Sequence, residues 1–213
     1  MSRAEPTLPE ELLLLALDPQ RGKPYCSDRY LRYAMAGAVL AELELQGRIS
    51  ASRDRVQVIK PLAPPDPLLA QIMASLPAPD KRGSAGGFGC RGWIRRTGRQ
   101  VAGLYLDHLV KYGVLRREVH RFLGVFPYVR HPAGPENWSP QVRSRFAAAE
   151  AGGFPDRRSR LLAGFAAAIG LGRTIAQGGR ASRAAMREAM HAEWAPNAVY
   201  RNVRQDKANR SGG

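Results

Sequence analysis

The stretch LRYAMAGAVLAELELQGRI (residues 31–49) contains the longest apolar run of the chain, from Tyr33 to Ala41. This run is too short to cross a bilayer, which takes about 20 apolar residues, and two glutamates follow it directly. It is typical of a helix buried in a protein core. We expect this helix to begin near Ser27 or Asp28 and to stop at Gly47, because glycine adopts the left-handed conformation that ends many helices.

Segments on both sides of this helix carry further helix signals. Thr7-Leu8-Pro9-Glu10 matches a capping box and predicts a helix from there to about Asp18. Asp66-Pro67 begins another helix whose apolar residues recur at helical spacing. The remaining helices are expected over residues 93–112, from Ser139, from Asp156, and over about 184–194. The sequence therefore predicts a mostly α-helical protein.

Two short stretches predict β-hairpins instead. In residues 47–60, Val56 and Val58 alternate with polar neighbours, and Ser52 to Asp54 make the turn. The second is FLGVFPYVR (residues 122–130), which is apolar on both faces and lies between two arginines. Its side chains of interest are Phe122, Leu123, Val125, Phe126 and Tyr128, with Arg121 and Arg130 at its sides.

An isolated two-stranded hairpin is only marginally stable, so this apolar ribbon needs a partner. The sequence allows three partners for the ribbon. The first is another subunit with which it pairs, and the second is a lipid interface that takes its aromatic side chains while the flanking arginines hold phosphates. The third is the protein's own core, onto which the ribbon would fold back. Pro127 would limit uncontrolled strand pairing at its edge.

The domain organisation follows from these segments. We expect a disordered N-terminus (residues 1–6), a single domain (7–194) and a polar C-terminal tail (195–213) that is frayed. Within the domain, residues 77–92 form a flexible Gly/Pro-rich loop, and residues 116–132 form the apolar hairpin.

The chain is strongly basic, with 33 lysines and arginines against 18 acidic residues and a formal net charge of +15. Such an excess attracts phosphate-rich partners, either nucleic acid or an anionic membrane surface. Only five of the basic residues are lysines, and guanidinium groups suit bidentate contacts with phosphate. The alternative is a solvated charged surface with no specific partner. Cys26 and Cys90 lack metal-site or redox spacing, which favours a reducing compartment and no disulfide.

Enzymatic chemistry has little support in the residues. Gly87-Phe88-Gly89-Cys90-Arg91-Gly92 reads as G-x-G-x-x-G, but the Pro- and Gly-rich segment before it is not the hydrophobic strand that a dinucleotide site requires. The four histidines show no metal-ligand spacing. His131, which precedes Pro132, is expected to order the base of the second hairpin. We expect no catalytic residue, metal or cofactor.

Two groups of arginines are the candidate binding residues. Arg91, Arg95 and Arg99 are four residues apart and therefore form one stripe along a helix, about 40° apart around its axis. Such a stripe can hold a multiply charged phosphate; its alternative role is a solvated face. Arg29 and Arg32 form a second group at the start of the core helix, where they alternatively lie along the domain surface.

Set in order, several motifs resemble the Golgi phosphoprotein family over residues 7–172. They are TLPEELLLLALD (7–18), LRYAMAGAVLAELELQGRI (31–49), PPDPLL (64–69), WIRR (93–96), LVKYGVLRRE (109–118), FLGVFPYVRHP (122–132) and PDRRSRLLAGFAAAIGL (155–171). The resemblance implies a central helical bundle ringed by amphipathic helices, with a projecting β-hairpin. The absence of the acidic N-terminal extension of animal members fits a bacterial member.

The resemblance also implies a function without catalysis. Family members bind phosphatidylinositol 4-phosphate through a basic pocket on a membrane-facing surface, and their hairpin serves self-association and lies at the membrane. For this chain, it implies a peripheral membrane adaptor that is cytoplasmic, or on the cytoplasmic face of the Golgi in a eukaryote. The implied partners are phosphoinositide or other anionic lipid, a second copy through the hairpin, and cytoplasmic tails of membrane proteins. A specific nucleic acid is not implied, and nucleic-acid binding is the alternative function.

The family pocket is only partly preserved in this chain. Its tryptophan position falls on Ser27, its core-helix arginine on Ala36, and its two long-helix arginines on Arg99 and Ala102. Arg32 lies one turn before Ala36, and Arg95 lies one turn before Arg99. We therefore predict a lipid-headgroup site made of Arg99, Arg95, Arg91, Arg32 and Arg29.

Overall fold

The computed structural model describes residues 5–52, 54–77, 87–122 and 125–211. The elements within these ranges, in chain order, are α1 (Leu8–Ala16), α2 (Asp28–Leu45), β1 (Ile49–Ser52), β2 (Arg55–Val58), α3 (Pro67–Ala74), β3 (Phe88–Gly89), α4 (Cys90–Lys111), β4 (Glu118–Phe122), β5 (Phe126–Arg130), α5 (Ser139–Ala151), α6 (Arg157–Ala168), α7 (Gly172–Ile175), α8 (Gly179–Ala192) and α9 (Trp194–Ser211). The prediction of a mostly helical protein with two short hairpins is confirmed.

Helix α2, which contains the apolar run from Tyr33 to Ala41, occupies the centre of the molecule. It contacts α1, α4, α6 and α9, and its residues from Tyr33 to Leu43 are all buried. Gly47 has a φ of +65° and follows the end of the helix, as the sequence predicted. The amide of Arg48 then donates to the carbonyl of Leu43 at 2.9 Å. Glycine therefore ends the helix for the expected reason.

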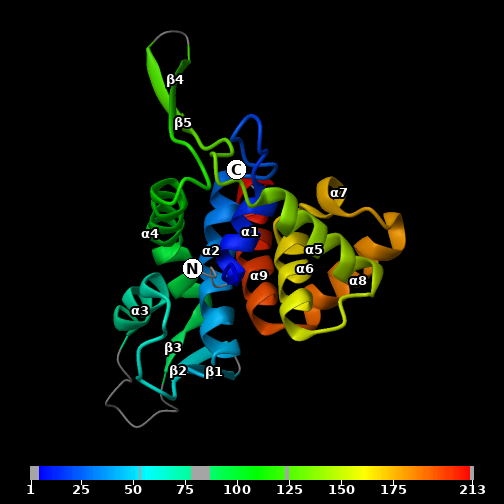
Figure 1. Cartoon of the computed structure of the whole chain (residues 1–213). Coiled ribbons are helices and arrows are strands. Elements are labelled where there is room, and N and C mark those ends of the chain that lie inside the picture. The colour runs from blue at the N-terminus through cyan, green and yellow to red at the C-terminus, as the bar shows by residue number, and fades with distance from the viewer. Residues whose placement is uncertain (1–4, 53, 78–86, 123–124, 212–213) are drawn as a thin grey trace.

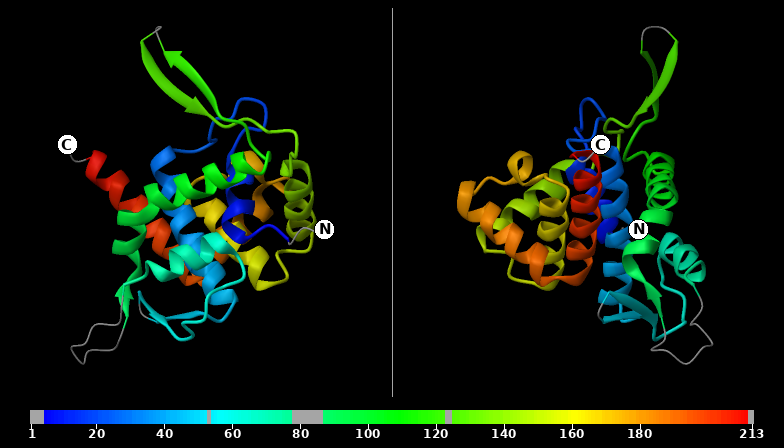
Figure 2. Two further views of the ribbon diagram at one scale, coloured as in Figure 1. Left: turned by 60° about the vertical axis from the view of Figure 1, so that its left-hand side comes forward. Right: turned by 180° about the vertical axis from the view of Figure 1, so that it is seen from behind.

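The other helices lie on two sides of α2 (Figure 1). Helices α3 and α4 lie on one side together with the small sheet, and α5, α6, α8 and α9 lie on the other. Helix α1 packs against α2 and also contacts α5 and α6. The two views in Figure 2 show the same arrangement, with the β4–β5 hairpin rising from one end of the molecule.

The C-terminal segment is not the polar tail that the sequence predicted. Residues 194–211 form helix α9, which buries Val199, Val203 and the polar side chains of Asn202 and Asp206 against α2, α4 and α6. Gly37 of α2 makes room for it, since a Cβ at that position would lie 2.7 Å from a methyl group of Val199. The prediction was wrong because the buried polar groups of α9 find partners in other helices, which the local sequence does not reveal. Helix α8 also begins earlier than predicted, at Gly179.

The segment predicted as a flexible loop, residues 77–92, has a defined end. Phe88 and Gly89 form β3, which pairs antiparallel with β2 and completes a three-stranded sheet in the order β1-β2-β3. Phe88 is buried and its ring lies 6.0 Å from that of Trp93. The prediction was therefore wrong for this end, because strand pairing and burial hold it, while residues 78–86 lie outside the described part.

The second predicted hairpin forms β4 and β5, which pair antiparallel with Phe122 opposite Phe126. It projects from the body of the molecule (Figures 1 and 2). The possibility that it folds back on its own core is thus wrong.

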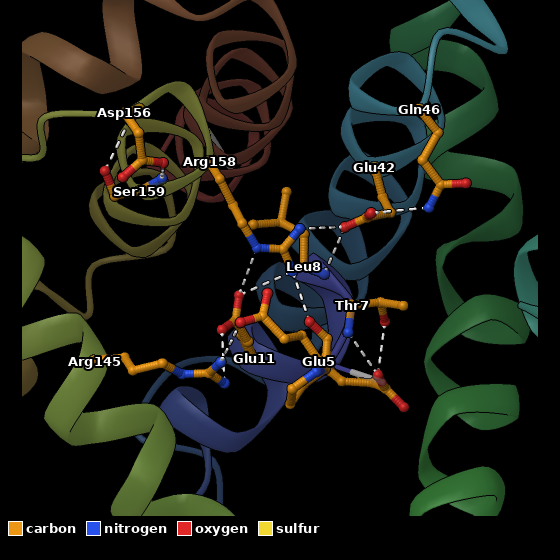
Figure 3. A network of polar contacts seen from close by, with 12 residues as sticks. Glu5, Thr7, Leu8, Glu11, Glu42, Gln46, Arg145, Asp156, Arg158 and Ser159 are labelled. Carbon is orange, nitrogen blue, oxygen red and sulfur yellow. Dashed lines mark hydrogen bonds and ion pairs between the residues drawn. The ribbon is translucent and has the colours of Figure 1, made fainter. Parts of the chain in front are cut away.

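A buried charge network connects the N-terminus to three helices (Figure 3). Arg158 of α6 lies 2.9 Å from the carboxylate of Glu42 and 3.1 Å from that of Glu11, and it donates to the carbonyl of Pro6 at 2.7 Å. The predicted capping box is present, with the Thr7 amide donating to Glu10 at 2.7 Å. The prediction of disorder is therefore wrong for Glu5 and Pro6, because Arg158 binds the carbonyl of Pro6 and Arg145 lies 4.0 Å from the carboxylate of Glu5; residues 1–4 lie outside the described part.

Replacing Arg158 with methionine is expected to lower the free energy of unfolding by about 2–3 kcal/mol, somewhat less than for a fully buried pair because the Arg158 side chain is 32% exposed. The substitution leaves Glu42 and Glu11 buried without their shared cation, which is strongly destabilising for a buried pair. Denaturation by guanidinium chloride measures the change. Arg160→Met is the matched control, since Arg160 is 40% exposed and pairs with Glu193 at 3.5 Å; a loss below about 1 kcal/mol is expected. If both variants lost the same free energy of unfolding, the stabilising role of the Arg158 network would be contradicted.

Candidate functional site

The close contact between α2 and α4 brings two of the predicted arginines together. A Cβ at Gly98 of α4 would lie 2.7 Å from the carbonyl oxygen of Arg32 on α2. Only glycine permits the backbones to approach to this distance. Arg99 follows Gly98 directly, so the contact places Arg32 and Arg99 on the same hollow.

This hollow has a volume of about 400 Å³ and lies where α2, α4, the α1–α2 loop and the base of the hairpin meet. Arg32, Asp28, Arg99 and His131 supply its ionisable side chains. The other lining residues are Leu13, Leu17, Gly22, Pro24, Leu31, Ala102, Gly103, Leu106 and Val129. Because Val129 belongs to β5, the hairpin forms part of the wall of this hollow.

The charges in the hollow are only partly compensated. Arg32 forms an ion pair with Asp28, one turn before it on α2. Arg99 is exposed, and its side chain has no hydrogen-bond or ion-pair partner among the residues that the structure describes. Burial and the nearby charge of Arg117 lower the pKa of His131 below its ordinary value of 6.5, against the opposing influence of Asp107 and Asp28. At neutral pH the imidazole is therefore uncharged, and Arg99 supplies the uncompensated positive charge.

The remaining three arginines of the predicted site bind helix α9 instead. Arg95 donates to Asp206 at 2.7 Å and to Gln205 at 2.9 Å, while Arg29 lies 3.4 Å from the other oxygen of Asp206. Arg91 donates to Asn202 and to Gln205, at 3.3 and 3.1 Å. A buried carboxylate requires such partners, so these contacts hold α9 against α2 and α4.

The stripe of three arginines therefore divides between two functions. Arg99 lies in the hollow, whereas Arg91 and Arg95 stabilise the position of the C-terminal helix. The hydroxyl of Tyr33 also donates to Asp206, at 3.0 Å, and Arg95 lies 5.8 Å from the centre of its ring. No signal in the local sequence identified Asp206 as the partner, because it lies more than a hundred residues from Arg95.

The substituted family positions have different surroundings. Ala36 is fully buried in α2, whereas Ala102 contributes to the hollow. Arg32, one turn before Ala36, also lies in the hollow, as the sequence suggested for a replacement charge. Arg95 does not, since Asp206 binds it.

The hairpin presents apolar side chains to solvent. Val125 is 71% exposed and Phe126 65% exposed, and Tyr128 and Val129 are also exposed. Tyr128 is held between His120, whose ring stacks on it at 5.5 Å, and Arg130, whose guanidinium lies 5.0 Å from its centre. The predicted residues Leu123 and the side chain of Phe122 lie outside the described part of the chain.

The base of the hairpin is fixed to the α1–α2 loop. The amide of His131 donates to the carbonyl of Gly22 at 3.1 Å, and that of Ala133 to Pro19 at 2.8 Å. A Cβ at Gly22, where φ is +61°, would collide with the backbone of His131 and Pro132. The backbone at His131 therefore helps to fix the hairpin base, through an amide contact that does not depend on the imidazole.

The end of the molecule that carries the hairpin also gathers basic residues. The start of α2, the α1–α2 loop and the C-terminal end of α9 all lie there (Figures 1 and 2). The last turns of α9 expose three basic residues at intervals of three, Arg204, Lys207 and Arg210. Sequence reasoning missed these residues because it did not recognise the helix. The loop adds Arg21 and Lys23.

The two cysteines and the glycine-rich motif lie in surroundings that do not suit catalysis. Burial raises the pKa of Cys26 to about 12 and that of Cys90 to about 11, so neither thiol ionises near neutral pH. The G-x-G-x-x-G segment (residues 87–92) contains β3, a two-residue strand of a small antiparallel sheet, and the first residues of α4. It does not lie at the end of a parallel strand, as a dinucleotide site requires.

A comparison with protein-family models places the chain in a family. No helix in the described part of the chain has the length and apolar character needed to cross a membrane. A search of the curated proteins found no match. The family model described as Golgi phosphoprotein 3 (GPP34) matches residues 8–205, which includes the hollow, the hairpin and most of α9. The chain belongs to the Golgi phosphoprotein 3 (GPP34) family.

Proposed function

We propose that this protein is a non-enzymatic, peripheral membrane protein that binds phosphoinositide or other anionic lipid through the end that carries the hairpin. The observation that carries this proposal is the position of the hollow containing Arg32 and Arg99 beside an exposed apolar hairpin. One surface thus offers both a charged group for a phosphate and apolar side chains for the lipid interface. A nucleic-acid surface has no need of the exposed Val125 and Phe126.

Arg99 is the central residue for the headgroup. Its guanidinium is free of protein partners among the described residues, so it can donate to phosphate oxygens without breaking an existing contact. Arg32 contributes a second guanidinium, but it shares its charge with Asp28. The basic residues of α9 and of the α1–α2 loop add a non-specific attraction of about 1 kcal/mol each near an acidic leaflet.

The hairpin anchors the protein in this proposal. Phe126 and Val125 enter the interface between headgroups and acyl chains, while Arg121 and Arg130 remain at the level of the phosphates. Pairing of hairpins between two subunits is the other use of the same surface, and Pro127, opposite Arg121, restricts pairing at that edge. Cytoplasmic tails of membrane proteins are the proposed cargo of the bound form.

Arg99→Gln is expected to weaken binding to vesicles containing phosphatidylinositol 4-phosphate about fivefold, equivalent to about 1 kcal/mol. Co-sedimentation at about 0.15 M salt, with phosphatidylserine vesicles of equal charge for comparison, measures this effect. Arg96→Gln, an exposed arginine on the same helix, is the matched control and changes binding less. Equal effects of the two variants would refute a defined headgroup site, and preferential binding of duplex DNA over either vesicle would refute the lipid function.

Phe126→Ser with Val125→Ser is expected to lower vesicle binding at least tenfold without lowering the melting temperature, because both side chains are exposed in the protein alone. Ile59→Ser with Leu62→Ser is the control, since these side chains are also exposed but lie outside the hairpin. Sedimentation velocity without vesicles shows whether the hairpin variant changes the oligomeric mass. A loss of mass with unchanged vesicle binding would assign the hairpin to self-association and contradict insertion.

Binding to phosphatidylglycerol vesicles is expected to strengthen as the pH falls below 6.5. The pKa of His131 lies below that value in the protein, so protonation begins there and adds a positive charge to the hollow. The charge of the phosphodiester lipid does not change in this range. Co-sedimentation between pH 7.5 and 5.5 measures the effect, and His131→Asn is expected to reduce it. An identical pH profile in the variant would exclude His131 from the binding site.

A further inference from the structure

A second hollow lies on the side of the molecule away from α4 and the hairpin. It has a volume of about 440 Å³ and is formed by the end of α6, by α7 and by α8. Figures 1 and 2 show these elements at the edge of the molecule across the core from α4. Its lining residues are Ala167, Gly170, Gly172, Arg173, Arg183, Met186 and Arg187. Three of these seven residues are arginines, and no carboxylate is among them.

The arginines of this hollow differ from most of the arginines described above. Arg29, Arg95, Arg145, Arg157, Arg158 and Arg201 each pair with a carboxylate. Arg173, Arg183 and Arg187 have no hydrogen-bond or ion-pair partner in the part of the chain that the structure describes. Arg183 and Arg187 are one turn apart on α8, so they repel each other unless an anion lies between them.

The hollow is built on a supported backbone. Met186, at its floor, is fully buried. The link between α7 and α8 is tied to α5, because the carboxylate of Glu150 accepts hydrogen bonds from the amides of Gln177 and Gly178, both at 2.8 Å. Gly170 turns the chain between α6 and α7 with a φ of +85°. The positions of Arg173 and Arg183 therefore follow from the fold and require no ligand to form them.

The chemistry of these residues selects a phosphate. Guanidinium groups match the geometry of phosphate oxygens and bind them through paired hydrogen bonds. The volume falls within the range of about 300–1,000 Å³ that is usual for small-molecule sites. We propose that the α7–α8 hollow binds a phosphate monoester or diphosphate group, independently of the lipid site at the other side of the core.

The test uses the full chain and inorganic pyrophosphate as the probe. Isothermal titration at about 0.15 M salt is expected to show saturable binding, and Arg183→Gln with Arg187→Gln should weaken it at least tenfold. Arg204→Gln with Arg210→Gln on α9 removes the same charge from the hairpin end and should leave pyrophosphate affinity within about twofold. Melting curves establish that both double variants are folded.

A second arm identifies the source of the phosphate. Vesicles containing phosphatidic acid carry the same phosphomonoester on a lipid. If binding of pyrophosphate and binding of these vesicles are both weakened by the loss of Arg183 and Arg187, a lipid phosphate reaches the hollow. If only the binding of pyrophosphate is weakened, the ligand is a soluble phosphorylated compound. Either result supports the site. Equal weakening by both double variants, absence of saturable pyrophosphate binding, or duplex DNA binding that alone depends on the α8 pair would overturn it.

Discussion

The packing of small side chains along α2 is the constraint on which the rest of the structure depends. Ala34, Gly37, Ala38 and Ala41 are buried in α2, and a Cβ at Gly37 would lie 2.7 Å from a methyl group of Val199 in α9. Contacts at this distance are lost when a side chain is enlarged, because protein interiors are close-packed. The position of α4 against α2 defines the hollow with Arg99, and the position of α9 against α2 decides which arginines remain free.

Charge pairing separates the arginines that stabilise the fold from those available to a ligand. Asp206 is almost fully buried and engages Arg29, Arg95 and Tyr33, so these groups are needed to hold α9. In the same way, the carboxylates of Glu42 and Glu11 engage Arg158, and this contact joins α6 to α2 and α1. The net charge of +15 means that such carboxylates are too few for all the arginines. An anion binds most favourably at the arginines that have no carboxylate partner in the described part of the chain, and Arg99 and the arginines of the α7–α8 hollow are such residues.

Local sequence signals predicted the elements that have local causes. The capping box at Thr7, the caps at Asp66 and Asp156, and the terminating Gly47 each act within a few residues of their position, and all are present. The apolar hairpin was likewise visible in its composition. Helix α9 was not, because its buried face includes Asn202 and Asp206, which are polar and mark a tail by composition alone. Strand β3 depends on pairing with β2, some thirty residues earlier.

By itself, the sequence determined the helical class, the central helix, the apolar composition of the hairpin and membership of the family, because apolar periodicity, caps and ordered motifs are properties of the chain. It also determined the net charge of +15, from which we predict an anionic partner. Only the tertiary structure decided which arginines stabilise the fold and which are available to a ligand. Arg95 and Arg99 are one turn apart and chemically identical, yet one meets the carboxylate of Asp206 and the other faces an open hollow. That difference arises from where α9 packs, and electrostatic partners a hundred residues apart are set by packing alone.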